Sequence, residues 1–272
     1  MAEGKVSLPV VRGAGETSRT DLWWLEPLVV FVVFASFVVY ATWAAFQGNH
    51  YYLDKQGQNY LSPFYSPEII GNSPHAWIRG KPDWWPGWLV FSPALLILGG
   101  PVGFRMTCYY YRGAYYKAFW ADPPNCAVGE PRGSYLGENT WPLLIQNIHR
   151  YFLYIALIFI AFLAWDAIQA FIFTNAAGNK RFGIGVGSFV LTLNVILLGG
   201  YTLGCHSLRH LVGGGCDELG KSPTQKSVYD CVSCLNEYHM VWAWCSLFWV
   251  GFSDIYVRLC SMGIWTDFHF VF

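Results

Sequence analysis

Twenty consecutive residues near the start of the chain, PLVVFVVFASFVVYATWAAF (27–46), carry no charged side chain. A helix of about 20 apolar residues crosses a hydrocarbon core of about 30 Å, and it pairs every backbone amide where no water is present. The stretch therefore predicts a membrane-spanning helix. Composition agrees, because 54% of the 272 residues are hydrophobic and only 12% are charged, about half the charged share of a soluble domain. We expect an integral membrane protein.

Four further stretches have the length and apolar character of membrane spans: 84–104, 151–174, 182–208 and 238–257. The third and the fifth span contain one acid each, Asp166 and Asp254. Acids are costly in lipid, so each should face the interior of the bundle, as part of a structural pair or of a proton path. The sequence predicts an all-α integral membrane protein, a bundle of five transmembrane helices within residues 23–272.

The distribution of lysine and arginine indicates how the bundle is oriented in the membrane. Three lie in the polar tail 1–22, five in the segment 105–150 and three in the segment 209–238, against six on the opposite side. By the positive-inside rule the N-terminus and both segments, 105–150 and 209–237, are cytoplasmic. The tail lacks a signal-peptide pattern. A net charge of zero excludes nucleic acid as the main partner.

Thiols and imidazoles concentrate at the predicted cytoplasmic face, which holds six of the eight cysteines and four of the seven histidines. This face borders a reducing compartment, so metal or redox-centre ligation is favoured over structural disulfides. Within the string CHSLRH (205–210), His206 and His210 are four residues apart and lie on one side of a helix. Together they can bind one metal ion, or they can simply face water and lipid headgroups.

Several segments resemble the membrane anchor of succinate dehydrogenase. They are CYYYRGAYYK (108–117), CAVGEPR (126–132), HRYF (149–152), CHSLRH (205–210) and LNEYHM (235–240). The chain is most similar to the actinobacterial type, a single five-helix C subunit, over about residues 84–265. The resemblance implies a multi-pass protein of the bacterial plasma membrane. Its partners would be a flavoprotein subunit and an iron–sulfur subunit on the cytoplasmic side.

The resemblance also implies a cofactor, a Rieske-type [2Fe-2S] cluster through which electrons reach a quinone. Such a cluster takes two thiolates on one iron and two imidazoles on the other. The sequence lacks the C-x-H and C-x-x-H pairs of soluble Rieske domains, so the ligands are assigned from topology. We expect the thiolates to be two of Cys108, Cys126 and Cys205. The imidazoles are expected to be His206 and His210, or one of them with His239.

For the quinone, donors and apolar walls near the same face are expected from four residues: His149, Arg150, Tyr154 and Trp242. Two alternatives stay open. One is an anchor that holds haem b between histidines such as His149, His206 or His239. The other is a cofactor-free membrane tether or transporter in which Asp166 and Asp254 are the functional acids.

Overall fold

The computed structural model describes residues 13–55, 57–132, 140–141, 143–175 and 177–272. The predicted tail 1–22 therefore lies mostly outside the described residues, as does the stretch 133–139 of the predicted segment 105–150. The chain divides into two compact units. The first comprises 1–36 and 106–147, and the second comprises 37–105 and 148–272.

Four helices of the described chain have the length and hydropathy of membrane spans. They are α1 (Leu25–Gln47), α5 (His149–Gln169, within the apolar span Leu144–Gln169), α6 (Val186–Leu203) and α9 (His239–Met262). Many of their apolar side chains are exposed, as in Val39, Ile158 and Phe248, where a lipid-facing surface requires them. The prediction of a multi-pass helical membrane protein is confirmed, with four such spans in place of the expected five.

The expected span at 84–104 is wrong. Residues 84–92 form no helix, and the remainder forms two short ones, α2 (Ala94–Ile97) and α3 (Gly99–Met106). Twelve helical residues rise about 18 Å, too little for a hydrocarbon core of about 30 Å. Pro86, Pro93 and Pro101 interrupt the apolar run, and a proline removes a backbone donor and restricts the residue before it.

Helix α3 instead packs closely on α5 through two glycines. A Cβ atom added at Gly103 would lie 2.2 Å from the Phe152 ring, and one at Gly100 would lie 2.7 Å from Ile155. Only hydrogen fits at these two positions. The contact brings the C-terminal end of α3 to the first turn of α5, where the candidate site lies.

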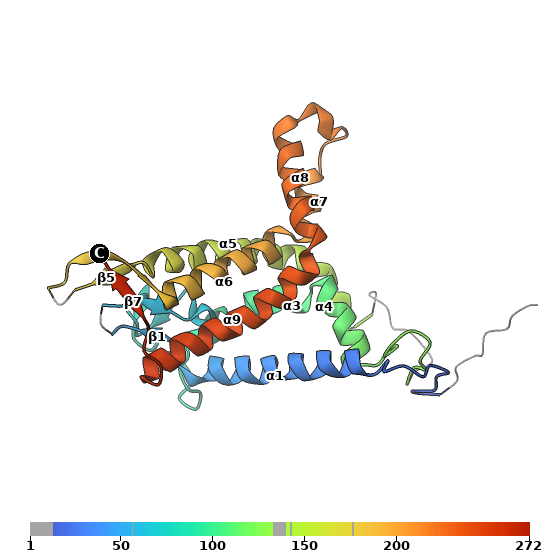
Figure 1. Cartoon of the computed structure of the whole chain (residues 1–272), viewed down its shortest axis with the longest axis horizontal. Helices are drawn as coiled ribbons and strands as arrows, with labels where there is room; N and C mark the ends of the chain where they lie inside the picture. Colours follow the sequence, from blue (N-terminus) through green and yellow to red (C-terminus); the bar gives the residue numbers. More distant parts are fainter. Residues whose placement is uncertain (1–12, 56, 133–139, 142, 176) are drawn as a thin grey trace, which may run out of the picture. The chain divides into compact units, whose positions relative to one another are not determined.

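The second unit is built around α5, α6 and α9, which run side by side in Figure 1. Beyond the helix ends, β5 (Ile172–Thr174), β6 (Lys180–Gly185) and β7 (His269–Val271) form a three-stranded antiparallel sheet. Phe173 pairs with Arg181, and Ile184 pairs with Phe270. The expected all-α class is therefore wrong in part, since the outer ends of two expected helices, 170–174 and 182–185, are strand and turn.

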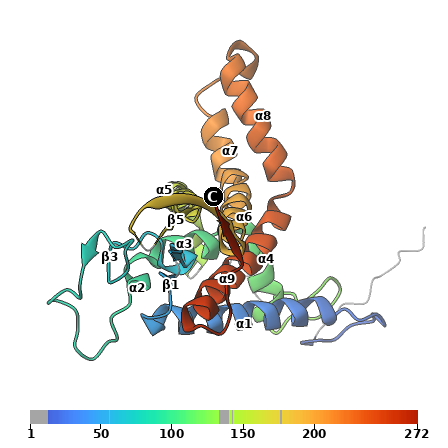
Figure 2. The same ribbon diagram turned by 60° about the vertical axis from the view of Figure 1, so that its left-hand side comes forward.

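The expected helix 182–208 also ends early. Helix α6 stops at Leu203, and after Gly204 and Cys205 a new helix, α7 (His206–Gly213), begins. It pairs with α8 (Pro223–Glu237), which lies within the predicted cytoplasmic segment 209–237. Figures 1 and 2 show this helical hairpin projecting away from α5, α6 and α9.

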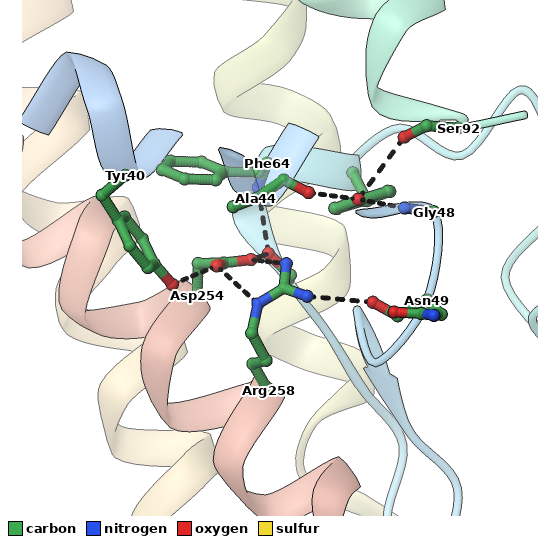
Figure 3. A network of polar contacts seen from close by, with 10 residues as sticks. Tyr40, Ala44, Gly48, Asn49, Phe64, Ser92, Asp254 and Arg258 are labelled. Carbon is green, nitrogen blue, oxygen red and sulfur yellow. Dashed lines mark hydrogen bonds and ion pairs between the residues drawn. The ribbon is translucent and has the colours of Figure 1, made fainter. Parts of the chain in front are cut away.

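The segment that follows α1 lies over the far ends of the helices, away from the hairpin. It contains the short strands β1 (Tyr52–Leu53), β2 (Tyr60–Leu61), β3 (Ile70–Gly71) and β4 (Ile78–Arg79), and the 3-10 turn η1 (Pro63–Tyr65). A buried ion pair in α9, between Asp254 and Arg258, holds this segment in place. Asp254 accepts hydrogen bonds from Tyr40 and from Ser62, both at 2.5 Å, and from Arg258 at 3.2 Å, and Arg258 donates to the carbonyl of Asn49 at 3.0 Å (Figure 3).

The first unit comprises the start of α1, helix α4 (Tyr109–Ala114), the π-helical turn η2 (Tyr115–Phe119) and the start of the 3-10 helix η3 (Leu143–Ile148). Phe34 of α1 packs edge-on against Tyr111, with ring centroids 5.1 Å apart. Arg19 donates to Asn125 at 3.1 Å and to the carbonyl of Cys126 at 2.9 Å. These contacts hold the segment 120–129 against the residues that precede α1.

Candidate redox and quinone site

A thiol and an imidazole meet where α5 begins and α6 ends. His149 is the first residue of α5, and its Nε2 lies 3.2 Å from the Sγ of Cys205. Cys205 is 1% exposed and precedes α7 as its N-cap. The position of this thiol depends on the break after α6. Gly204 ends that helix, and its carbonyl accepts a hydrogen bond from Asn236 of α8 at 2.7 Å.

A second imidazole is buried beside the first. His239 is the first residue of α9, is 2% exposed and stacks on Tyr201 with ring centroids 5.0 Å apart. Tyr201 contacts Phe104 at 5.2 Å, and Phe104 stacks on His149 at 4.8 Å. The rings of Tyr201 and Phe104 therefore connect the two imidazoles.

The other expected ligands lie in different surroundings. His206 and His210 face each other at 2.9 Å between their Nε2 atoms, as the four-residue spacing predicts, on an exposed face of α7. Partial burial, with the neighbouring His210 and Arg209 charges, lowers the pKa of His206 below 6.5. In the first unit Cys126 is exposed and Cys108 is buried. Within the described ranges, no three His, Cys, Asp or Glu side chains converge on a single metal position.

An apolar cavity of about 130 Å³ lies inside the second unit, between α3, α5, α6 and the η1 segment. Arg105, Tyr201 and Thr202 line the end nearest the two imidazoles, and Ser66 lines it beneath the η1 segment. The Arg105 guanidinium lies 4.9 Å from the centre of the Tyr201 ring and donates to Ser246 at 3.0 Å. The cavity is thus an apolar chamber with one cationic wall.

The four residues expected at the quinone do not line this cavity. His149 contacts Cys205, while Arg150 and Tyr154 are exposed on α5. Trp242 packs over Gly200, where an added Cβ would lie 2.6 Å from the indole ring. The buried indole Nε1 has no hydrogen-bond partner among the described residues.

Sequence reasoning missed Phe104, Arg105 and Tyr201 as parts of the site. The sequence predicts Phe104 as the last residue of a membrane span, Arg105 as the first residue of the cytoplasmic segment 105–150, and Tyr201 as part of the span 182–208. The string GFRM (103–106) offers a clue, because a glycine that permits close packing precedes an aromatic and a cationic residue at a helix end.

The fold and the site together define a multi-pass membrane protein with buried thiol and imidazole groups at one end of its bundle and an apolar chamber beside them. Residues 25–263 match the family model of the actinobacterial succinate dehydrogenase subunit SdhC. The chain belongs to this family and is a membrane subunit of succinate dehydrogenase. No curated protein gives a significant match.

A solved structure supports the assignment. A chain of the Mycobacterium smegmatis Sdh1 complex in the apo form is 39% identical, with a TM-score of 0.82, over 97% of this chain and 96% of that one. The resemblance in the sequence is therefore confirmed at the level of the family.

Proposed function

We propose that this subunit accepts electrons from the iron–sulfur subunit of succinate dehydrogenase at the end of the bundle near His149, and delivers them to a quinone in the apolar cavity. The flavoprotein subunit would oxidise succinate, and both soluble subunits would bind on the cytoplasmic side, in keeping with the lysine and arginine distribution. The observation that carries the proposal is the contact between His149 and Cys205 beside the buried His239.

The donor set fits a Rieske-type [2Fe-2S] cluster. Such a cluster supplies a one-electron carrier with a potential raised by its two imidazole ligands. Each iron needs only two protein ligands, so the four ligands need not converge on a single metal position. His149 and His239 would hold one iron, and Cys205 would be one of the two thiolates on the other.

Two features of the chain suit His149 and His239 to this role better than His206 and His210. Both are first residues of transmembrane helices, positions set by the packing of α5 and α9. The rings of Phe104 and Tyr201 fix the planes of their imidazoles. His206 and His210 instead lie on an exposed face of the projecting hairpin. The expectation from the sequence that Cys108 or Cys126 is a thiolate ligand stays a prediction.

The cavity offers a quinone head group apolar walls and few polar groups, as small-molecule sites usually do. Negative charge develops on the quinone oxygens as electrons arrive, and the guanidinium of Arg105 at the cavity wall would stabilise it. Thr202 and Ser66 would contribute hydroxyl groups. In this proposal the quinone would bind between the electron donor and the far side of the membrane.

Iron and acid-labile sulfide assays on the purified complex test the proposal. We expect two irons and two sulfides beyond those of the soluble subunits, and their loss in His149→Ala, His239→Ala and Cys205→Ser. Cys245→Ser is the matched control, because Cys245 is exposed on α9. Parallel Cys108→Ser and Cys126→Ser variants identify the second thiolate.

Iron content equal to that of the soluble subunits alone would refute the cluster. A pyridine haemochrome assay separates the haem b alternative, which predicts a haem signal from the same preparation. Loss of iron in His206→Ala, with iron retained in His149→Ala, would show that the histidine ligands lie on α7 and not at the start of α5.

A further inference from the structure

A second, polar cavity of about 610 Å³ lies at the far end of the second unit, between the end of α5 and the segment that follows α1. His75 and Asp166 line it together with Gln58, Glu68 and Lys180. The His75 Nδ1 lies 3.5 Å from a carboxylate oxygen of Asp166, and both side chains are about nine-tenths buried. The other ring nitrogen of His75 is buried and has no hydrogen-bond partner among the described residues.

Asp166 connects this polar cavity to the apolar one. Its second carboxylate oxygen accepts a hydrogen bond from Ser66 at 2.5 Å. Ser66 lines the apolar cavity, whereas Asp166 lines the polar cavity. The Ser66–Asp166 pair therefore forms part of the wall between the polar cavity and the chamber that we assign to the quinone.

Asp166 and Asp254, the two buried acids in the described membrane-spanning helices, differ in their surroundings. Asp254 is 0% exposed and is neutralised by Arg258. Asp166 has no arginine or lysine ion pair among the described residues, and its partners are a serine and an imidazole, each able to exchange a proton. An intramembrane acid of this kind, facing a wet cavity, is typical of a proton path.

Other titratable groups lining the polar cavity are Asp54, Glu68 and Lys180. Glu68 is 1% exposed and already accepts hydrogen bonds from Tyr51 at 2.8 Å, from the Ser73 amide at 3.2 Å and from the Ser73 hydroxyl. Asp54 and Lys180 are exposed at the rim. Of the described ionisable groups that line this cavity, Asp166 accepts the hydrogen bond of Ser66, and His75 is paired with Asp166.

We propose that His75, Asp166 and Ser66 form a proton relay through which quinone reduction takes up protons from the non-cytoplasmic side of the membrane. The inference rests on the proposed function, because it requires quinone in the apolar cavity. Succinate oxidation releases two electrons and two protons on the cytoplasmic side. The quinone takes up the two electrons and two protons to become quinol, with both protons arriving through Asp166.

Side-specific pH measurement tests the relay. The intact complex is reconstituted into phosphatidylcholine vesicles that enclose a pH-sensitive dye, with potassium and valinomycin present to collapse the membrane potential. Externally added succinate reaches only complexes whose soluble subunits face outward, and a short-chain naphthoquinone is the acceptor. We expect the luminal pH to rise, by two protons for each quinone reduced. An unchanged luminal pH during quinone reduction would overturn the proposal.

Substitutions then assign the residues. Asp166→Asn should lower the rate of quinone reduction at least tenfold and abolish the luminal pH change, while succinate-driven reduction of a soluble dye by the complex is unchanged. Asp166→Glu should retain most of the rate, and His75→Gln should shift the pH dependence of quinone reduction. Asp83→Asn, at an exposed carboxylate outside the cavity, is the matched control.

Filling the apolar cavity distinguishes failure of the relay from failure of the quinone site. Leu198→Trp places an indole in that cavity and should block quinone reduction. If Leu198→Trp reduces quinone at the wild-type rate, the proposed quinone site is wrong. If Leu198→Trp blocks the reaction but Asp166→Asn leaves both the rate and the luminal pH change intact, only the relay is wrong.

Discussion

The Asp254–Arg258 pair offers a stability prediction that follows directly from burial. Both side chains are at most 4% exposed, and the carboxylate accepts bonds from Tyr40, Ser62 and Arg258. Asp254→Ala leaves a buried guanidinium without its counter-charge. Removing one partner of such a pair costs about 3 to 5 kcal/mol. For a chain of this size that corresponds to a fall in Tm of about 6 to 20 °C.

The assay is thermal unfolding of the purified complex in detergent, followed by loss of the folded membrane subunit. Asp230→Ala is the control, because Asp230 pairs with Lys226 at 2.8 Å on the surface of α8, and an exposed pair of this spacing contributes about 0.3 to 0.5 kcal/mol. Asp254→Leu combined with Arg258→Met should recover most of the lost stability, since it leaves no unpaired buried charge.

A Tm for Asp254→Ala within about 2 °C of wild type would refute the reasoning, since the smallest expected fall is about 6 °C. The folded fraction should also reduce quinone at the wild-type rate. A specific loss of quinone reduction with an unchanged Tm would instead make Asp254 a functional acid in quinone reduction.

Three further predictions concern packing and ionisation. Gly103→Leu, whose Cβ would meet Phe152 at 2.2 Å, should destabilise the subunit by about 1 to 3 kcal/mol in the same unfolding assay, whereas Gly99→Ala, with no atom within 4 Å, should not. Gly200→Val should push Trp242 and the start of α9 aside and lower the cluster content measured as iron, whereas Gly199→Ala, which also meets open space, should leave it unchanged. Burial, aided by the bonded Glu68 carboxylate, raises the pKa of Tyr51 above 10. The stability that the Tyr51 hydroxyl contributes is therefore complete below about pH 10 and falls as the pH rises further. Because Tyr51→Phe has no such hydroxyl, its Tm should fall less than the wild-type Tm when the pH is raised above about 10.

The sequence predicted the helical spans well where apolar runs are uninterrupted, because length and hydropathy decide a membrane helix. Residues 27–46 lie within α1 (Leu25–Gln47), and α9 (His239–Met262) begins one residue after the predicted start at 238 and ends beyond the predicted end at 257. The prediction failed at 84–104, where prolines and glycines shorten the helices, and at 182–185, where residues of a strand are as apolar as those of a span. Hydropathy alone does not separate these cases.

The sequence predicted which types of residue gather at the candidate site, but only some of the individual residues. The sequence placed thiols and imidazoles at one end of the bundle, and Cys205 and His239 are buried there. It favoured His206 and His210 because they are adjacent on a helix, and it assigned His149 to the quinone. Only the three-dimensional packing of α3, α5 and α6 shows that His149 contacts Cys205, since 56 residues separate them.

Pulsed EPR of the succinate-reduced complex, prepared with histidine labelled with ¹⁵N, tests most directly whether the subunit carries a histidine-ligated redox centre. We predict two nitrogen couplings on one paramagnetic cluster beyond those of the soluble subunits. Both couplings should disappear together with the cluster in His149→Gln, and both should persist in His206→Gln. A spectrum without any nitrogen-coupled cluster, or couplings that survive in both His149→Gln and His239→Gln, would contradict the account.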